Sequence, residues 1–204
     1  MSAFVTADNG EYVYEVQRSK FIGLCRRVES DEQAAEVVAN IRRRYGDCTH
    51  VCYAYLTEES SRSCDDGEPS GTAGMPIMEC IRTAKLCNTL VAVVRYFGGI
   101  KLGAGGLVRA YTHTAAETLC VAHKTEVADC ALYSVRLDYA VWKKIEKRRV
   151  QSLYKLIGME YNKTVDIRCA ATDGDAFERE WQALTQGKCE IVPLGNGRAE
   201  RDAT

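Results

Sequence analysis

The stretch from Leu90 to Arg109, LVAVVRYFGGIKLGAGGLVR, decides the fold of the chain. Its first part, Leu90 to Phe97, is an almost unbroken apolar run, which is typical of a strand buried on both faces. Five glycines follow within nine residues. A helix is expected to begin near Gly105, because apolar residues recur every four positions after it. The stretch therefore predicts a buried strand, a glycine-rich turn and a helix in succession.

The glycine-rich turn has features of an anion site. Glycines permit positive φ angles and let backbone N–H groups point at a ligand, and the following helix presents unpaired N–H donors. The turn is neither a Walker loop nor a full dinucleotide fingerprint, whose third glycine is replaced by Val108. The same pattern also suits a sharp turn with close backbone packing. The candidate residues for binding an anion or a nucleic acid are Arg95, Gly98, Gly99, Lys101, Gly103, Gly105, Gly106 and Arg109.

An acidic loop precedes this strand, within a stretch from Thr57 to Met75 that shows no periodicity. Long loops without regular structure are usually functional or mobile. Asp65, Asp66 and Glu68 offer hard oxygen ligands for Mg²⁺ and, beside the glycine turn, resemble a phosphoryl-transfer site. The same residues also fit ordinary turn chemistry, since glycine or proline neighbours them. We assign no metal, no cofactor and no catalytic residue.

The rest of the first part predicts a mixed sheet and helices. Residues 11–28 alternate and indicate two strands that meet at Arg18-Ser19-Lys20. A helix is expected from Ser30 or Asp31 to Gly46, with its cationic last turn favoured by the helix dipole. His50 to Leu56 reads as a buried strand, and Pro76 to about Leu86 as a short helix.

A change of composition near residue 130 predicts a second domain. Residues 1–130 carry 14 basic and 17 acidic side chains, a net charge of −3, whereas residues 131–204 carry 13 and 11, a net charge of +2. The second part predicts a strand at 131–138, a helix at 140–157, one or two strands within 159–171, a helix around Trp181 and a strand from Cys189 to Leu194. This order is that of a ferredoxin-like domain. The polar tail after Gly195 is expected to fray.

A second basic patch is expected on the helix of this domain. Lys143, Lys144, Lys147 and Arg148 fall on one side of it, where they could face RNA or an acidic protein. The patch has no interleaved aromatic residues, so a solvated helix face is the alternative interpretation.

Composition bounds the class of protein. The net charge of −1 over 204 residues argues against bulk attraction to polyanions or anionic lipid, although it leaves room for a local basic patch. The start lacks a secretory signal and no apolar run is long enough to span a bilayer, so we expect a cytoplasmic protein without a membrane partner. Its 10 cysteines are then expected to be reduced, and Cys48, His50 and Cys52 are spaced as core positions rather than as ligands of one ion.

Two long motifs carry a family resemblance. The first is Asp65-Asp66-Gly67-Glu68-Pro69-Ser70-Gly71-Thr72-Ala73-Gly74-x-Pro76, and the second runs from Val93 to Tyr111. Ser19-Lys20-Phe21-Ile22 and the strand that contains His50 also match. Together these residues resemble the IMPACT/YigZ family, over residues 11 to about 192.

The resemblance implies an α+β fold of two domains. Residues 1–130 would share the fold of the second domain of a small-subunit ribosomal protein and of domain IV of elongation factor G. Residues 131–204 would form a ferredoxin-like domain similar to domain V of elongation factor G. Eukaryotic relatives restrain the amino-acid-starvation kinase by competing for its co-activator. The match does not include the additional amino-terminal domain of those regulators, so we do not carry kinase regulation over.

We therefore expect a translation-associated regulator of the cytoplasm that binds RNA, the ribosome or a translation factor through its glycine-rich, basic site. One alternative is an enzyme that acts on a phosphorylated small molecule or nucleotide in the same groove, although a non-enzymatic role is favoured. Another alternative is a protein–protein interaction module in which the glycine turn is purely structural.

Overall fold

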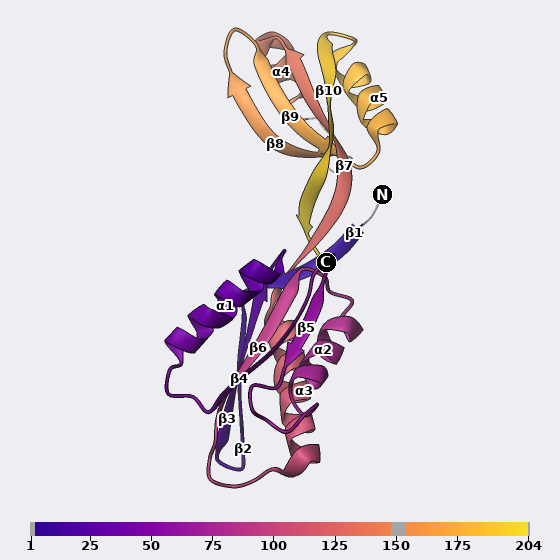
Figure 1. The fold of residues 1–204 in the computed structure, drawn as a ribbon. Helices are drawn as coiled ribbons and strands as arrows, with labels where there is room; N and C mark the ends of the chain where they lie inside the picture. Colours follow the sequence, from indigo (N-terminus) through magenta and orange to yellow (C-terminus); the bar gives the residue numbers. More distant parts are fainter. Residues whose placement is uncertain (1–2, 148–153, 204) are drawn as a thin grey trace. The chain divides into compact units, whose positions relative to one another are not determined.

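The computed structural model describes residues 3–147 and 154–203. The chain divides into two compact units, Phe4–Glu126 and Val127–Arg201, each with a sheet, helices and a core of its own (Figure 1). No helix in the described part is both long enough and apolar enough to cross a bilayer. Because both units combine strands and helices, the chain is a mixed α+β protein.

The first unit is built on a five-stranded sheet in the order β2-β3-β6-β4-β5, with antiparallel neighbours throughout. Its strands are β2 (Gly10–Val16), β3 (Ser19–Arg27), β4 (His50–Leu56), β5 (Ser61–Cys64) and β6 (Thr89–Tyr96), and its helices are α1 (Asp31–Arg44), α2 (Gly74–Thr83) and α3 (Gly103–Val121). The apolar run of β6 lies at the centre of the sheet, which confirms the prediction of a strand buried on both faces.

Helices cover both faces of this sheet, α1 on one and α2 with α3 on the other (Figure 1). Alternate residues of β6 divide between the two layers: Leu90, Ala92 and Val94 pack with α1, while Val91 and Val93 pack with α2 and α3. Because side chains alternate along a strand, Arg95 lies on the side of α2 and α3. This placement directs a charged side chain into the core of the unit.

Local sequence signals account for the boundaries of several elements. Gln17 and Arg18 have positive φ angles and form the tight turn between β2 and β3. The hydroxyl of Ser30 accepts a hydrogen bond from the Gln33 N–H and caps α1, as expected. The stretch from Thr57 to Met75 is not structureless as predicted, because Ser61–Cys64 pairs with β4 as strand β5.

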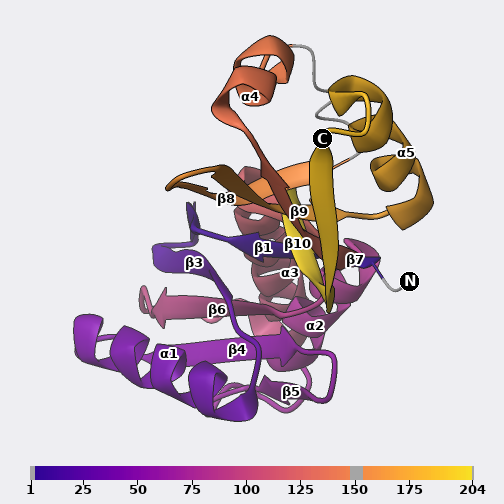
Figure 2. The same cartoon turned by 90° about the horizontal axis from the view of Figure 1, so that it is seen from above.

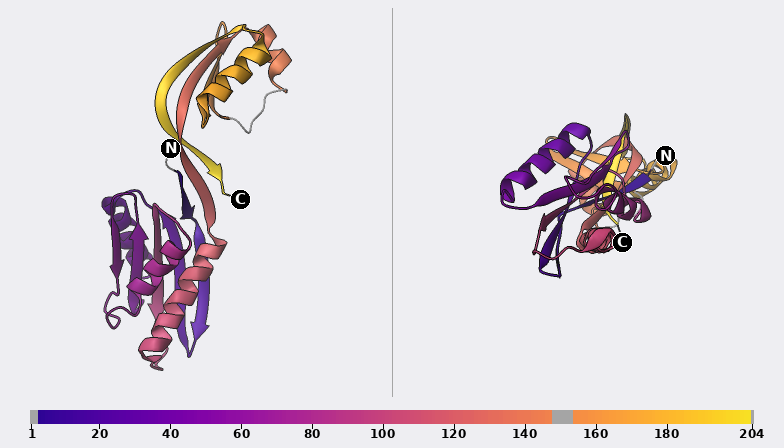
Figure 3. Two further views of the ribbon diagram at one scale, coloured as in Figure 1. Left: turned by 90° about the vertical axis from the view of Figure 1, so that its right-hand side faces the viewer. Right: turned by 60° about the horizontal axis from the view of Figure 1, so that its bottom comes forward.

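The second unit is a sheet covered by helices on one face (Figures 2 and 3). Its elements are β7 (His123–Leu137), α4 (Tyr139–Ile145), β8 (Tyr154–Tyr161), β9 (Val165–Ala171), α5 (Gly174–Thr185) and β10 (Cys189–Asp202). The strand order is β10-β7-β9-β8, and β1 (Ala3–Asp8) also pairs with β7. Trp142 of α4 and both Phe177 and Trp181 of α5 are buried against the strands.

Two expectations for this unit are wrong. The helix predicted over 140–157 ends at Ile145, and the chain is already in strand β8 from Tyr154 onward, while residues 148–153 lie outside the described part. The tail after Gly195 continues as part of β10 to Asp202, because it pairs with β7. The second error arises because the polar tail has no apolar alternation of its own.

Candidate functional site

The glycine-rich loop, defined as residues 98–106, comprises the connection after β6 and the first turn of α3, and it is anchored to the turn between β2 and β3 (Figure 1). A Cβ atom on Gly98 would lie 2.0 Å from the carbonyl carbon of Arg18, so only glycine permits this approach. The Gly98 N–H donates to the hydroxyl of Ser19 over 3.2 Å. The Phe97 N–H donates to Thr49 Oγ1 over 3.0 Å. The loop thus begins from a fixed position at one end of the sheet.

The five glycines of the loop differ in what the fold requires of them. Gly99 and Gly103 have φ angles of 83° and 70°, a conformation that other residues rarely adopt. Gly106 is tightly packed, since a Cβ there would lie 3.0 Å from the Cβ of Leu102. Gly105 has an ordinary φ, and a Cβ there would meet no atom within 4 Å. Packing and backbone conformation therefore explain every glycine of the loop except Gly105.

Exposed cations surround this loop. Lys101 lies in it, and Arg109 follows on α3. Arg18 and Lys20, at the adjoining turn, are exposed as well, although they were not among the predicted site residues. They stand about 80 residues upstream, so only the close approach of Gly98 to Arg18 reveals that they adjoin the loop. Two apolar side chains are also exposed here, Phe97 at 46% and Ile100 at 42%.

Arg95, the third predicted cation, is buried rather than exposed. Its Nη1 donates to Glu68 Oε1 over 2.5 Å, and the two side chains are only 5% and 4% exposed. Its guanidinium carbon lies 5.3 Å from the ring centroid of Phe21 and 5.4 Å from that of Phe97. The charge of Arg95 is therefore committed to Glu68, and the residue supports Phe97 from beneath.

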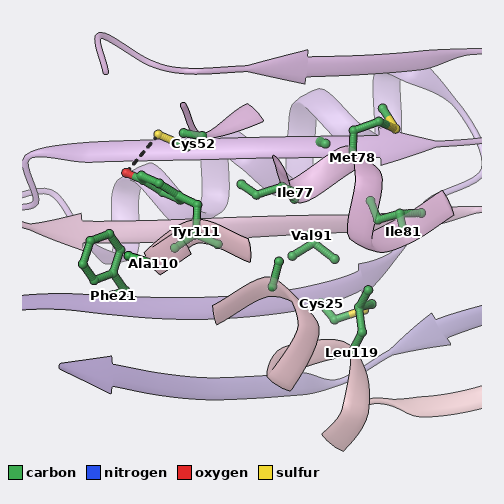
Figure 4. Close-up of a cluster of buried hydrophobic side chains, with 14 of the residues drawn as sticks. Phe21, Cys25, Cys52, Ile77, Met78, Ile81, Val91, Ala110, Tyr111 and Leu119 are labelled. Carbon is green, nitrogen blue, oxygen red and sulfur yellow. Dashed lines mark hydrogen bonds between the residues drawn. The ribbon is translucent and has the colours of Figure 1, made fainter. Parts of the chain in front are cut away.

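Tyr111 completes this buried cluster. Its hydroxyl donates to Glu68 Oε1 over 2.8 Å and lies 3.3 Å from the sulfur of Cys52 (Figure 4). Burial raises the pKa of Tyr111, so the phenol keeps the proton that it donates. Burial likewise raises the pKa of the Cys52 thiol, and no cysteine of the described residues is in a disulfide. The cluster ties α3 and the acidic loop to the central strand.

The acidic loop uses its other two carboxylates to hold itself together. Asp65 accepts hydrogen bonds from the N–H groups of Gly71, Ala73 and Gly74 over 2.8–2.9 Å. Burial raises the pKa of Asp65, but these three donors outweigh it and hold the pKa below its usual range. Asp66 accepts from Arg42 over 2.6 Å and from the N–H of Val51 over 2.7 Å. These carboxylates stabilise the loop through bonds within the chain.

The described residues contain no cluster of three or more His, Cys, Asp or Glu side chains that could hold a metal ion. The imidazole Nδ1 of His50 lies 2.7 Å from the carbonyl oxygen of Asp66. His113 packs edge-on against Tyr12 and Tyr14. Cys48 precedes β4 rather than lying on the strand with His50 and Cys52. These contacts place both histidines in structural roles.

The predicted basic patch of the second unit is only partly described. Lys143 and Lys144 are exposed in the last turn of α4, Lys147 is exposed just beyond it, and Arg148 lies outside the described residues. The same unit has a hollow of about 420 Å³ lined by β7, β8 and β9. The charged side chains that line it form ion pairs with each other, Arg136 with Asp166 over 2.6 Å and Arg168 with Glu160 over 3.7 Å.

Comparisons with known proteins agree with this architecture. The family model described as the Impact N-terminal domain matches residues 17–119. The IMPACT family member YvyE of Bacillus subtilis is 35% identical over 93% of this chain and 90% of its own length. An IMPACT family member of Thermus thermophilus is 43% identical over 61% of this chain and 68% of its own. A crystal structure of a hypothetical protein, 27% identical, superposes with a TM-score of 0.62 and covers 95% of this chain and 98% of that one. The chain therefore belongs to the IMPACT family.

Proposed function

We propose that this protein is a translation-associated regulator of the cytoplasm that binds RNA, alone or on the ribosome, at the end of the first unit formed by the glycine-rich loop and the turn between β2 and β3. Gly105 carries the proposal. It stands in the first turn of α3, where no side chain caps the helix, and neither its conformation nor its surroundings require glycine. A ligand that closely approaches the backbone at this position would explain why the residue is glycine.

The surroundings of Gly105 favour RNA over a small phosphorylated ligand. Lys101, Arg109, Arg18 and Lys20 are all exposed around this end of the unit, which suits an extended phosphate backbone. Phe97 is 46% exposed, so its ring is open to stacking against an unpaired base. The carboxylates of the acidic loop, which the enzymatic alternative would need free, are bonded within the chain.

The domain organisation implied by the family resemblance belongs to the same proposal. Residues 1–130 would be the domain similar to domain IV of elongation factor G, and residues 131–204 a ferredoxin-like domain similar to its domain V. The order β-α-β-β-α-β and the strand order β10-β7-β9-β8 of the second unit support the ferredoxin-like assignment. Lys143, Lys144 and Lys147 would then give the second domain an auxiliary contact with RNA.

The proposal is tested by measuring the binding of a labelled single-stranded RNA, and of purified ribosomes, over a range of salt concentrations. Lys101→Ala and Arg109→Ala should each weaken RNA binding and reduce the slope of log K against log salt by about 1. Arg82→Ala removes an exposed cation from the last turn of α2, before β6 begins, and should leave both quantities unchanged. Absence of binding to RNA and ribosomes at every salt concentration would refute the proposal.

Gly105→Ala separates a functional glycine from a structural one. It should raise the free energy of unfolding by about 0.5–1 kcal/mol, because the position is helical and open, and it should weaken RNA binding. A stabilised variant that binds RNA as well as the parent would contradict the role given to Gly105. Thermal stabilisation by a nucleotide with Mg²⁺, in a protein that binds no RNA, would favour the enzymatic alternative instead.

A further inference from the structure

Strand β2 forms one edge of the first sheet, and every second residue directs its backbone N–H and C=O groups outward. The two-residue turn at Gln17 and Arg18 makes Val16 and Ser19 a hydrogen-bonded pair. Hydrogen-bonded pairs alternate along an antiparallel ladder, so Glu15, Val13 and Glu11 direct their N–H and C=O groups away from β3. Among the described residues no other strand pairs with this outer edge.

The other sheet edges carry protection that β2 lacks. Strand β5 is only 4 residues long, β8 has a register irregularity between Leu156 and Gly158, and β10 contains Pro193. Strand β1 is already bridged to Leu86 through Val5. Short length, bulges and proline are devices that prevent another chain from pairing with an edge. Strand β2 keeps an unbroken register over 7 residues and contains no proline, lysine or arginine. Its edge is therefore suited to accept a further strand.

The side chains of the outward-facing residues form an acidic, apolar, acidic series on one face of the sheet. Glu11 and Glu15 are exposed, and Val13 between them is 46% exposed. Glu15 stands opposite Lys20 on β3, and Glu11 Oε2 lies 4.0 Å from Arg44 Nη2. Pairs of this kind in contact with water contribute little energy, so both carboxylates stay available to a partner.

This series disfavours pairing between two copies of the chain. An antiparallel pair of β2 strands centred on Val13 would place Glu11 of one copy opposite Glu15 of the other, and like charges directly opposite destabilise a sheet. A strand with basic residues at the same two positions would instead meet both glutamates. The charge pattern thus selects a partner of opposite sign.

We propose that the outer edge of β2 accepts an extended segment of a partner protein, which adds a strand to the sheet and places Lys or Arg side chains opposite Glu11 and Glu15. Main-chain hydrogen bonds to Glu11, Val13 and Glu15 supply affinity, and the two glutamates supply selectivity. This interaction is independent of RNA binding at the glycine-rich loop.

The test uses a synthetic peptide as long as β2, with lysine opposite Glu11 and Glu15 and valine opposite Val13. Fluorescence anisotropy should show binding, and a matched peptide with glutamate in place of lysine should bind about tenfold more weakly or not at all. Hydrogen exchange should show new protection of the amides of Glu11, Val13 and Glu15, whereas those of Tyr12 and Tyr14 are protected already. Lack of binding, or protection elsewhere in the chain, would overturn the proposal.

Two variants of the full chain sharpen the test. Val13→Pro removes an outward-facing N–H without touching the bonds to β3 and should abolish peptide binding, while Val13→Thr keeps the N–H and should retain it. Glu11→Lys with Glu15→Lys should reverse the preference to the acidic peptide and does not depend on how the fold tolerates proline. Equal binding by all variants would refute the proposal, as would a β2-dependent dimer that binds neither peptide.

Discussion

Glu68 and Arg95 show how a single residue pair links the acidic loop to the central strand. The two charges are almost fully buried, and Glu68 also accepts the hydrogen bond of Tyr111. Removal of one member of a buried ion pair leaves the other charge without compensation in a medium that solvates it poorly. Loss of either residue alone therefore destabilises the fold by more than the intact pair stabilises it.

We expect Glu68→Gln to lower the free energy of unfolding by about 3–5 kcal/mol, because it leaves the Arg95 guanidinium buried beside a neutral partner. Arg95→Met should lower the free energy of unfolding by a similar amount. The double variant Glu68→Leu, Arg95→Met should lower it by less than the sum of the two single changes. Urea denaturation measures all three. Glu29→Gln, which breaks a solvent-exposed pair with Arg27, serves as the control and should change stability by less than about 1 kcal/mol.

The same residues mark what sequence alone predicts about the site. Arg95, Lys101 and Arg109 are equally cationic neighbours of the glycines in the sequence, and nothing in that pattern distinguishes the buried arginine from the exposed residues. Burial of Arg95 follows from the alternation of β6 together with Glu68, which stands 27 residues earlier. Arg18 was missed for a similar reason, since its proximity to Gly98 depends on the pairing of β3 with β6.

At the scale of elements, helix α2 begins without a capping side chain at its N-cap, Ala73. The carboxylate of Asp65 takes that role from the acidic loop, because it accepts from the N–H groups of Ala73 and Gly74. Loop and helix are therefore stabilised together. This contact explains why a loop that contains Gly67 and Gly71 holds a defined conformation.

Asp65→Asn should destabilise the first unit at neutral pH by on the order of 1 kcal/mol, since the amide replaces a charged acceptor. The pKa of Asp65 is lowered on folding from 3.8, so its ionisation stabilises the fold above about pH 3.8, and this stabilisation is lost as the pH falls through the folded-state pKa. The difference in stability between the parent and the variant should therefore shrink below pH 3.8. Urea denaturation across that range measures the difference, and one that stays constant with pH would contradict the role of Asp65.

Elements with strong periodicity were predicted, and elements defined by pairing were not. The prediction gave β4 its observed bounds, and the apolar runs of β6 and α3 were recognised, because burial leaves a regular pattern in their sequences. Strand β5 and the distal part of β10 are polar, so no alternation reveals them, and only their neighbours β4 and β7 make them strands. Lys147 was predicted on the same helix as Lys143 and Lys144, yet α4 ends at Ile145.

At the scale of the whole molecule, each unit has a separate hydrophobic core. The first unit has two layers of buried side chains, one on each face of its sheet, and the second has a single aromatic cluster around Phe177. Both tryptophans of the chain, Trp142 and Trp181, are buried in the second core. Tryptophan fluorescence therefore reports on the second unit alone.

This distribution predicts that the two units unfold as distinguishable transitions. Glu68→Gln, which disrupts the first core, should shift the loss of circular dichroism from the first unit to lower urea concentration, while the tryptophan fluorescence transition keeps its midpoint. A mutation of the second core, Phe177→Ala, should do the reverse and move the fluorescence midpoint, since large-to-small changes at such a site cost about 3–5 kcal/mol. If either variant moves both signals by the same amount, the units unfold as one cooperative body. The separate cores would then be coupled rather than independent, and RNA binding at the first unit would have to be assayed in the intact chain.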